Sequence, residues 1–162
     1  MSEKNYQRTT IVFPVKNGEY LLGMKKRGFG AGWWNGYGGK LEPNESYEDS
    51  ARRETFEEVG ISVKGLKQIA NLVFYNEDKV QVVSRAYLAE FEGEPEETEE
   101  MNPKFFKLSD FPFDDMWPGD DKWIPEVISG DNGVKDYEIY FDKDDKFIKI
   151  INVKNEDIED KF

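Results

Sequence analysis

Residues 39–61 place the strongest constraint on how this chain can fold, because they combine helix start and stop signals with a cluster of acids. Ser46 is a suitable N-cap residue, and two acidic residues follow it in the first turn, where negative charge is favourable. Gly60 stands where a left-handed C-terminal cap is needed. These signals predict a short acidic helix from about Tyr47 to Val59.

Three glutamates of this helix, Glu54, Glu57 and Glu58, are predicted to project from one side, at about 100° per residue. Phe56 and Val59 point roughly the opposite way and are expected to pack. Carboxylates at this spacing repel one another by about 0.2–0.5 kcal/mol per pair, so an isolated helix would be more stable without them. A bound divalent cation would make the same arrangement of carboxylates favourable. Mg²⁺ prefers as ligands a few carboxylates, retained waters and substrate phosphates. The acidic side is therefore a predicted magnesium site.

Two further residues are expected to support this site. Arg53 is placed to pair with the acids and orient them, and Glu45 is expected to hold the loop or to join the metal shell. A solvated acidic face is the alternative interpretation, and it would be preferred for a Glu-Glu pair alone. The full spacing decides against it: Gly39, five residues, Glu45, seven residues, Arg53-Glu54, two residues, Glu57-Glu58, one residue, Gly60.

That spacing is the pattern of the Nudix box, and the chain resembles the Nudix hydrolases, enzymes that cleave nucleoside diphosphates linked to another group. The resemblance implies an α+β fold in which a mixed β-sheet is flanked by helices as an α/β/α sandwich. It also implies a single Nudix domain over residues 1–162, with the box at residues 39–61. Thr55 departs from the pattern, since the family usually has an aliphatic residue there. Threonine is β-branched and can pack, so we expect a small effect.

Composition narrows the possible chemistry. The 162 residues suit one domain with a real core, and 15% of them are aromatic, which favours a folded chain over a disordered acidic one. Cysteine and histidine are both absent from the sequence. Their absence excludes disulfides, thiolate or histidine metal ligands and histidine bases, and it leaves carboxylates with a hard metal ion as the main catalytic option.

The formal net charge of −12 argues against binding to DNA, RNA or anionic membranes. Mg²⁺ and local cations must also overcome the repulsion between this chain and a triphosphate, which favours metal dependence. No apolar run approaches membrane-spanning length, and the N-terminus lacks the apolar segment of a secretory signal. We therefore expect a cytoplasmic monomer whose partner is a small-molecule nucleoside triphosphate, with no nucleic acid and no membrane.

Alternating apolar residues outside the box predict several strands and few helices. The expected strands lie at 8–15, 20–24, within 61–74 and 80–91, and at 105–108, 137–141 and 147–153, with a helix near 121–129. Asn17-Gly18 is a hairpin signal between the first two strands. The acidic run at 92–100 is expected to be a solvated loop, and the tail from about Asn155 is expected to fray.

Two further blocks, residues 21–39 and 115–123, resemble one branch of the family. This branch contains the MutT-like enzymes that hydrolyse oxidised purine nucleoside triphosphates, such as 8-oxo-dGTP and 2-hydroxy-dATP, to the monophosphate and pyrophosphate. The resemblance implies nucleotide-pool sanitisation, a part of DNA repair, with Mg²⁺ as the cofactor and Mn²⁺ as the alternative ion. It assigns the metal and water-activating roles to the Gly38 carbonyl, Glu54, Glu57, Glu58 and Glu100. Glu54 is the expected general base, and Glu100 is the second candidate.

The substrate-binding residues implied by the same resemblance are Thr10, Lys25, Phe29, Asn35, Phe74, Trp117 and Asp120. Lys25 would neutralise phosphate charge, and Phe29 lies in the glycine-rich run before the box. Trp117 offers a ring face for base stacking, typically worth ~1–3 kcal/mol per base, while Asn35 has both a donor and an acceptor for a purine edge.

One departure from this branch concerns the two acids that usually follow its Trp-Pro pair, because Gly119 stands first here. If Trp123 sets the register, the second acid is Asp120 alone. If the loop has slipped by one residue, both acids are retained as Asp120 and Asp121. A single carboxyl would favour another substrate, such as a normal or methylated purine triphosphate or a dinucleotide polyphosphate. A non-catalytic nucleotide-binding module is a further alternative, which the three intact box glutamates oppose.

Overall fold

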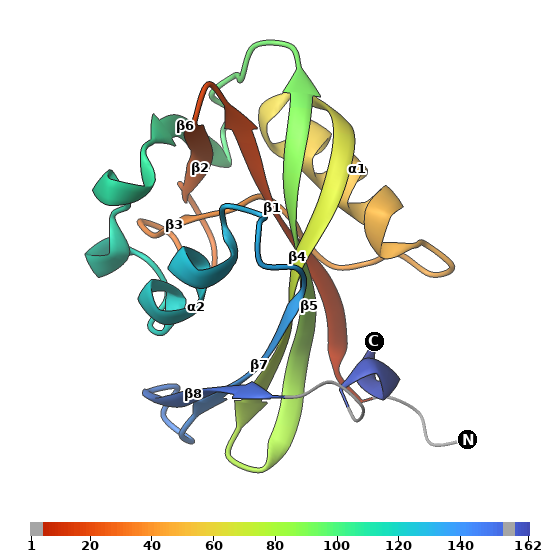
Figure 1. Ribbon diagram of the computed structural model, residues 1–162, viewed down its shortest axis with the longest axis vertical. Coiled ribbons are helices and arrows are strands. Elements are labelled where there is room, and N and C mark those ends of the chain that lie inside the picture. The colour runs from red at the N-terminus through yellow and green to blue at the C-terminus, as the bar shows by residue number, and fades with distance from the viewer. Residues whose placement is uncertain (1–4, 154–157) are drawn as a thin grey trace.

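A computed structural model describes residues 5–153 and 158–162 of the chain (Figure 1). The strands are β1 (Gln7–Lys16), β2 (Glu19–Lys25), β3 (Trp34–Asn35), β4 (Ser62–Asn76), β5 (Lys79–Glu92), β6 (Met101–Phe106), β7 (Lys135–Phe141) and β8 (Phe147–Val153). The α-helices are α1 (Tyr47–Val59) and α2 (Asp120–Val127), and short 3₁₀ turns cover Leu108–Asp110, Phe113–Asp115 and Glu159–Lys161. Neither α-helix of the described part has the length and apolarity of a membrane span.

The described strands form one mixed sheet. Their order is β3-β2-β1-β5-β4-β7-β8, and β6, outside this sequence of neighbours, also pairs with β2. Strand β1 is parallel to β5 and β4 is parallel to β7, while the remaining neighbours are antiparallel. Helices α1 and α2 lie on opposite sides of this sheet (Figure 1). The predicted α+β fold with a mixed sheet flanked by helices is confirmed.

The apolar core has a layer on each side of β1. Phe13 packs with Trp123 and Ile124 of α2, whereas its neighbour Val12 packs with Ala51 of α1. Successive side chains of a strand point to opposite faces, so a central strand covered by helices on both sides must be apolar at consecutive positions. This central position of β1 brings the middle of the strand close to both helices.

Helix α1 begins and ends at the predicted residues. The Ser46 hydroxyl accepts a hydrogen bond of 3.0 Å from the Asp49 amide, and Gly60 adopts φ 77°, the left-handed cap. The prediction that Phe56 packs is wrong, since that residue is 58% exposed. Thr55 is fully buried instead, and its hydroxyl donates to the Ala51 carbonyl at 2.7 Å. That bond satisfies the polar atom that an aliphatic residue would lack.

The other differences from prediction arise from contacts between distant residues. Strand β3 was not among the predicted strands, but it pairs with Gly23 and Met24 of β2. Strand β6 begins at Met101, four residues before the predicted strand at 105–108, and a 3₁₀ turn starts at Leu108. Asn155 lies outside the described residues. The fraying predicted for the tail is wrong for residues 158–162, because Ile158 is only 3% exposed and packs against the sheet.

Candidate active site

Glu54 and Glu58 are held against the glycine segment that follows β3. The Gly38 amide donates a hydrogen bond of 2.9 Å to Oε1 of Glu58. A Cβ atom on Gly39 would lie 2.6–2.8 Å from the carboxylate atoms of Glu54, and one on Gly38 would lie 1.8 Å from the carbonyl oxygen of Thr10. Only glycine therefore fits at position 38 beside the β1 backbone, and a side chain at position 39 would have to displace the Glu54 carboxylate.

Burial raises the pKa of both carboxyl groups. For Glu58 the pKa rises to about 8, chiefly because burial disfavours the charged form; the Gly38 hydrogen bond and Lys25 act in the opposite direction. Burial also raises the pKa of Glu54, while the hydrogen bond from Arg53 opposes the rise. A cation beside two such acids stabilises their ionised forms, so this donor pair fits a hard divalent ion.

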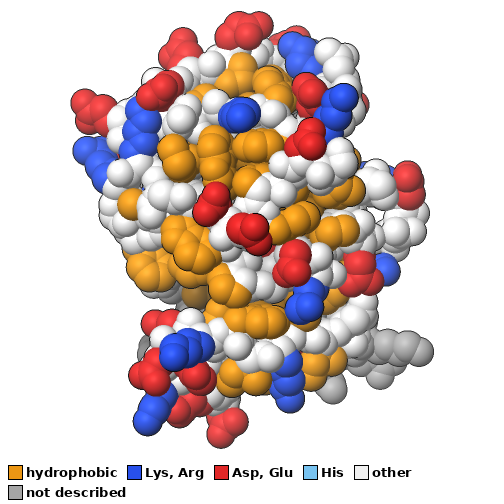
Figure 2. Space-filling model, turned by 90° about the vertical axis from the view of Figure 1, so that its left-hand side faces the viewer, with side chains coloured by type: hydrophobic (Ala, Val, Ile, Leu, Met, Phe, Trp, Pro, Cys, Tyr) orange, Lys and Arg blue, Asp and Glu red, His pale blue; other side chains and the backbone are white. Residues whose placement is uncertain are grey.

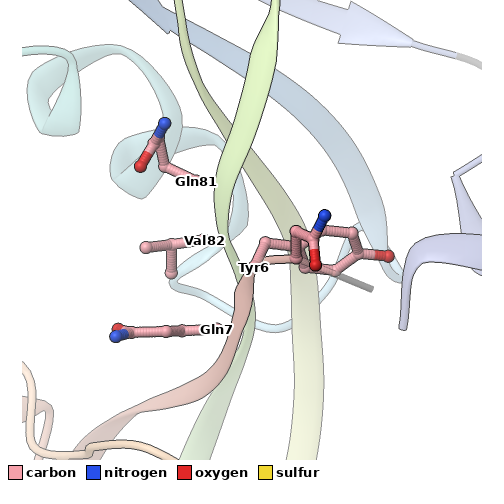
Figure 3. Close-up of a pocket in the computed structure, with 5 residues that line it drawn as sticks. Tyr6, Gln7, Gln81 and Val82 are labelled. Carbon is pink, nitrogen blue, oxygen red and sulfur yellow. The ribbon is translucent and has the colours of Figure 1, made fainter. Parts of the chain in front are cut away.

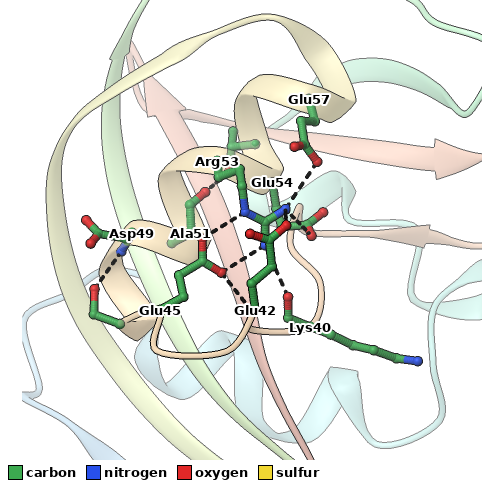
Figure 4. Close-up of polar contacts among 10 residues, drawn as sticks. Lys40, Glu42, Glu45, Asp49, Ala51, Arg53, Glu54 and Glu57 are labelled. Carbon is green, nitrogen blue, oxygen red and sulfur yellow. Dashed lines mark hydrogen bonds and ion pairs between the residues drawn. The ribbon is translucent and has the colours of Figure 1, made fainter.

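Arg53 connects the acidic side of α1 to the preceding loop (Figure 4). Its guanidinium binds Glu45 through two hydrogen bonds of 2.8 and 2.9 Å, and it also reaches Glu54 at 2.9 Å, Glu57 at 3.2 Å and the Lys40 carbonyl at 3.2 Å. The hydrogen bond from Arg53 lowers the pKa of Glu45 to about 2. Of the two roles predicted for Glu45, the structure shows the first: its carboxylate accepts two hydrogen bonds from the Arg53 guanidinium and so holds the loop.

Glu57 and Glu100 lie at the edge of this arrangement. The Glu57 side chain is 56% exposed and bound to Arg53, and the Glu100 side chain is 60% exposed and lies 3.3 Å from a guanidinium nitrogen of Arg27. Among the described residues, no three acidic side chains are already gathered as a set of metal ligands. Glu54, Glu58 and the Gly38 segment are thus brought together, whereas the metal roles of Glu57 and Glu100 stay predictions.

Replacing Gly39 by alanine is expected to lower kcat/KM by about tenfold or more while leaving the fold intact, because the new methyl group must displace the Glu54 carboxylate. The measurement is steady-state kinetics together with a thermal melt. Gly65→Ala is the matched control, since a Cβ there meets nothing within 4 Å. Full activity of Gly39→Ala would show that the position of Glu54 does not matter for turnover.

Trp117 lies in a cluster of aromatic rings next to α2. Its ring centroid is 5.4 Å from that of Phe29, which is 80% exposed, and 5.4 Å from that of Trp33. Figure 2 shows apolar side chains gathered across the middle of the face that carries β3 and α2, with acidic groups around and between them. An exposed aromatic surface of this kind suits a flat apolar ligand such as a purine.

Asp120 is the first residue of α2, and its side chain is buried. The Trp123 indole nitrogen donates to it at 3.0 Å. Burial raises the pKa of Asp120 to about 7, and the hydrogen bond from Trp123 limits the rise. Gly119 precedes it in the left-handed conformation, and Asp121 is exposed. One carboxyl group rather than two therefore faces the interior here.

The remaining predicted substrate-binding residues lie on four different strands. Thr10 of β1 is 2% exposed, and its hydroxyl has no hydrogen-bond partner in the described part of the chain. Asn35 of β3 accepts a hydrogen bond of 2.8 Å from the Gly36 amide. Phe74 of β4 is partly buried against the core on the α2 side. Lys25 ends β2, where it lowers the pKa of Glu58.

A polar pocket of about 460 Å³ lies where β1 and β5 begin (Figure 3). Its lining residues are Asn5, Tyr6, Gln7, Gln81 and Val82, none of them acidic or basic. Val82 pairs with Gln7 on one side and with Phe74 on the other, but none of the predicted substrate-binding residues lines the pocket. It lacks the cations and carboxylates that phosphate chemistry needs.

Sequence reasoning missed Trp33 and the ion pairs that hold the loop after β2. Lys26 contacts Glu97, and Arg27 contacts Glu99 at 3.6 Å as well as Glu100. The alternation of basic and acidic runs was visible in the sequence, but nothing there indicated which run meets which. Part of the acidic run at 92–100 is consequently paired rather than simply solvated.

Comparison with known proteins identifies the family of this chain. Residues 5–127 match the NUDIX domain family. The chain is 45% identical over 121 residues to the oxidized purine nucleoside triphosphate hydrolase of Danio rerio, covering 74% of this chain and 78% of that protein; the Mus musculus protein of the same name is 43% identical with the same coverage. The crystal structure of a MutT protein from Bacillus halodurans superposes with a TM-score of 0.71 at 26% identity, covering 90% of this chain and 97% of the other. With the box glutamates set on α1 against a glycine segment, the chain belongs to the Nudix hydrolase family.

Proposed function

We propose that this protein hydrolyses oxidised purine nucleoside triphosphates, such as 8-oxo-dGTP and 2-hydroxy-dATP, to the monophosphate and pyrophosphate. The observation that carries the proposal is the pair of partly buried carboxyl groups, Glu54 and Glu58, held against Gly38 and Gly39. The aromatic cluster around Trp117 and the buried Asp120 supply a neighbouring site for the base. The zebrafish and mouse relatives carry names that state this activity.

Nudix hydrolases generally use a divalent metal, and in this chain the ion would be Mg²⁺, with Mn²⁺ as the alternative. The residues that would hold it are the Gly38 carbonyl, Glu54, Glu57, Glu58 and Glu100. A bound divalent ion neutralises phosphate charge and favours the ionised form of a water molecule. The raised pKa values of Glu54 and Glu58 are the structural support, because both carboxyl groups gain from a nearby cation.

Glu54 is the proposed general base that takes a proton from the attacking water. Arg53 binds one oxygen of its carboxylate at 2.9 Å and so limits its rotation. Glu100 is the second candidate, but its carboxylate is exposed and lies beside Arg27. Lys25 is close enough to Glu58 to lower its pKa and is placed to bind phosphate oxygens. Phosphoryl transfer depends mainly on such positioning and charge neutralisation.

The purine base is proposed to bind beside Trp117 and Asp120, apart from the carboxyl groups of α1. Trp117, with Phe29 beside it, offers its ring face for stacking, and Asn35 offers an amide to the purine edge. The pKa of Asp120, about 7, means that both protonation forms are accessible near neutral pH. The protonated form donates a hydrogen bond and the ionised form accepts one, so a single carboxyl can serve bases with different edges.

The test is pyrophosphate release with Mg²⁺, comparing kcat/KM for 8-oxo-dGTP, 2-hydroxy-dATP, dGTP and dATP in one assay. The expected result is a preference of at least about a hundredfold for an oxidised base, which corresponds to ~2.7 kcal/mol of transition-state discrimination. Equal hydrolysis of all four nucleotides would overturn the oxidised-purine assignment and leave the Nudix chemistry.

A second candidate substrate is favoured by Gly119. Because only Asp120 faces the interior, the base site carries one carboxyl where the related branch has two acids, and the alternative substrate is a normal or methylated purine triphosphate or a dinucleotide polyphosphate. We further propose a cytoplasmic monomer, which binds neither nucleic acid nor membranes. The net charge of −12 supports this, because it repels both polyanions.

A further inference from the structure

Trp33 and Trp34 are neighbours in the sequence but contact different residues. Trp34 packs edge-on against Phe106, with ring centroids 5.1 Å apart and planes at 79°. Trp33 immediately precedes the two residues of β3, and its ring lies against Trp117, the residue proposed to stack the purine. Trp33 is therefore directed toward the proposed base site.

The Trp33 ring stacks on Trp117. The two ring centroids are 5.4 Å apart and the planes are inclined by 28°. Both side chains are partly exposed, so this stack lies at the rim of the site rather than in the core. Stacked aromatic pairs at this separation contribute beyond the area they bury.

The backbone holds Trp33 in place more firmly than it holds Phe29. The Trp33 carbonyl accepts a hydrogen bond of 3.2 Å from the Lys25 amide, and its own amide donates to the Gly30 carbonyl at 3.1 Å. Phe29 also contacts the Trp117 ring, but it is 80% exposed on a loop whose Gly28 and Gly30 adopt positive φ. Trp33 is consequently the anchored partner of Trp117, and Phe29 is the one at the loop tip.

We propose that Trp33 is a positioning residue for purine recognition, which acts by stacking on Trp117 and fixing the plane that receives the base. This inference rests on the proposed function, in which Trp117 stacks the purine. A ring whose orientation is fixed before binding loses less conformational freedom when the base arrives. Trp33 thereby raises affinity without touching the reacting phosphates.

The experiment is a double-mutant cycle with Trp33→Ala, Trp117→Ala and the double variant. It measures KM and kcat for 8-oxo-dGTP and, by titration calorimetry, the Kd of the product 8-oxo-dGMP. Trp33→Ala is expected to raise KM and Kd by about two- to tenfold, the usual contribution of a stacked aromatic pair, with kcat nearly unchanged. The same change should have no further effect once Trp117 is alanine, and Trp33→Phe should restore most of the loss.

Trp34→Phe is the matched control, because it alters the neighbouring indole, which packs against Phe106 and not against Trp117. It is expected to lower the melting temperature and to leave the Kd of 8-oxo-dGMP within about twofold. The inference fails if Trp34→Phe weakens product binding as much as Trp33→Ala does, since both changes would then merely loosen β3.

Two other results would also overturn it, and they separate it from the proposed function. If Trp117→Ala weakens binding but Trp33→Ala does not, or if the two losses simply add, Trp33 does not act through Trp117 and only the inference fails. If Trp117→Ala leaves KM and Kd unchanged, the base binds elsewhere, and the proposed base site fails together with the inference.

Discussion

Replacing Glu58 by glutamine is expected to lower kcat/KM by at least about a hundredfold while leaving the protein folded. Loss of groups that merely orient a metal ligand typically costs 10- to 100-fold, so loss of a proposed ligand should cost more. Folding should change little, because burial already favours the uncharged form of this carboxyl, whose pKa is about 8, and an amide oxygen can still accept the Gly38 hydrogen bond.

The measurement is steady-state pyrophosphate release together with a thermal melt of the metal-free protein. Glu48→Gln is the matched control on the same helix, since the Glu48 side chain is 62% exposed and contacts only Arg52 among the charged partners described, at 3.9 Å. Near-normal activity of Glu58→Gln would remove Glu58 from the metal site. A collapse of the melt would instead show that its effect on turnover comes through the fold.

Replacing Asp120 by asparagine is expected to reduce the preference for 8-oxo-dGTP over dGTP by about tenfold or more. 8-Oxoguanine carries a hydrogen at N7 where guanine has a lone pair, and an ionised carboxylate is the strongest side-chain acceptor for that hydrogen. Asparagine cannot ionise, although it can keep the hydrogen bond from Trp123. The measurement is the ratio of kcat/KM values for the two nucleotides. Equal losses on both would point to a structural role for Asp120.

The same variant should be more stable than the parent protein at high pH. The pKa of Asp120 rises from the ordinary 3.8 to about 7 in the folded protein because the group is buried. Between these values the unfolded chain releases the proton and the folded chain keeps it, so the free energy of unfolding falls as pH rises from about 4 to about 7. Asparagine does not ionise, so the free energy of unfolding of the Asp120→Asn variant does not fall in this way. Melting temperatures at pH 8 should therefore favour Asp120→Asn, and the gap should narrow toward pH 4.5.

The parts of the fold that sequence reasoning predicted well depend on local signals. The ends of α1 were predicted because Ser46 and Gly60 act on their own turns of helix. The hairpin between β1 and β2 was predicted because Asn17 and Gly18 both adopt positive φ, as an Asn-Gly turn requires. Such signals act within a few residues, so they can be identified in the sequence before any tertiary contact is known.

The predictions that failed depend on contacts between distant residues. Strand β3 exists only because β2 offers it a partner, and Ile158 is buried because Val73 and Val83 lie beneath it. Helical periodicity placed Phe56 opposite the acids, but it could not show which part of α1 would meet the sheet. The sheet meets Ala51, Thr55 and Val59 instead. Asp120 was named from resemblance, while its burial against Trp123 needed the structure.

Arg53 gives α1 an internal counter-ion. Its single guanidinium binds Glu45, Glu54 and Glu57, so the helix folds with its acids already partly neutralised by the chain itself. Many small metal-binding domains fold only when their metal is bound. We therefore expect this protein to fold equally well in a metal-starved cell or in a chelating buffer, and to become active as soon as the ion is supplied again.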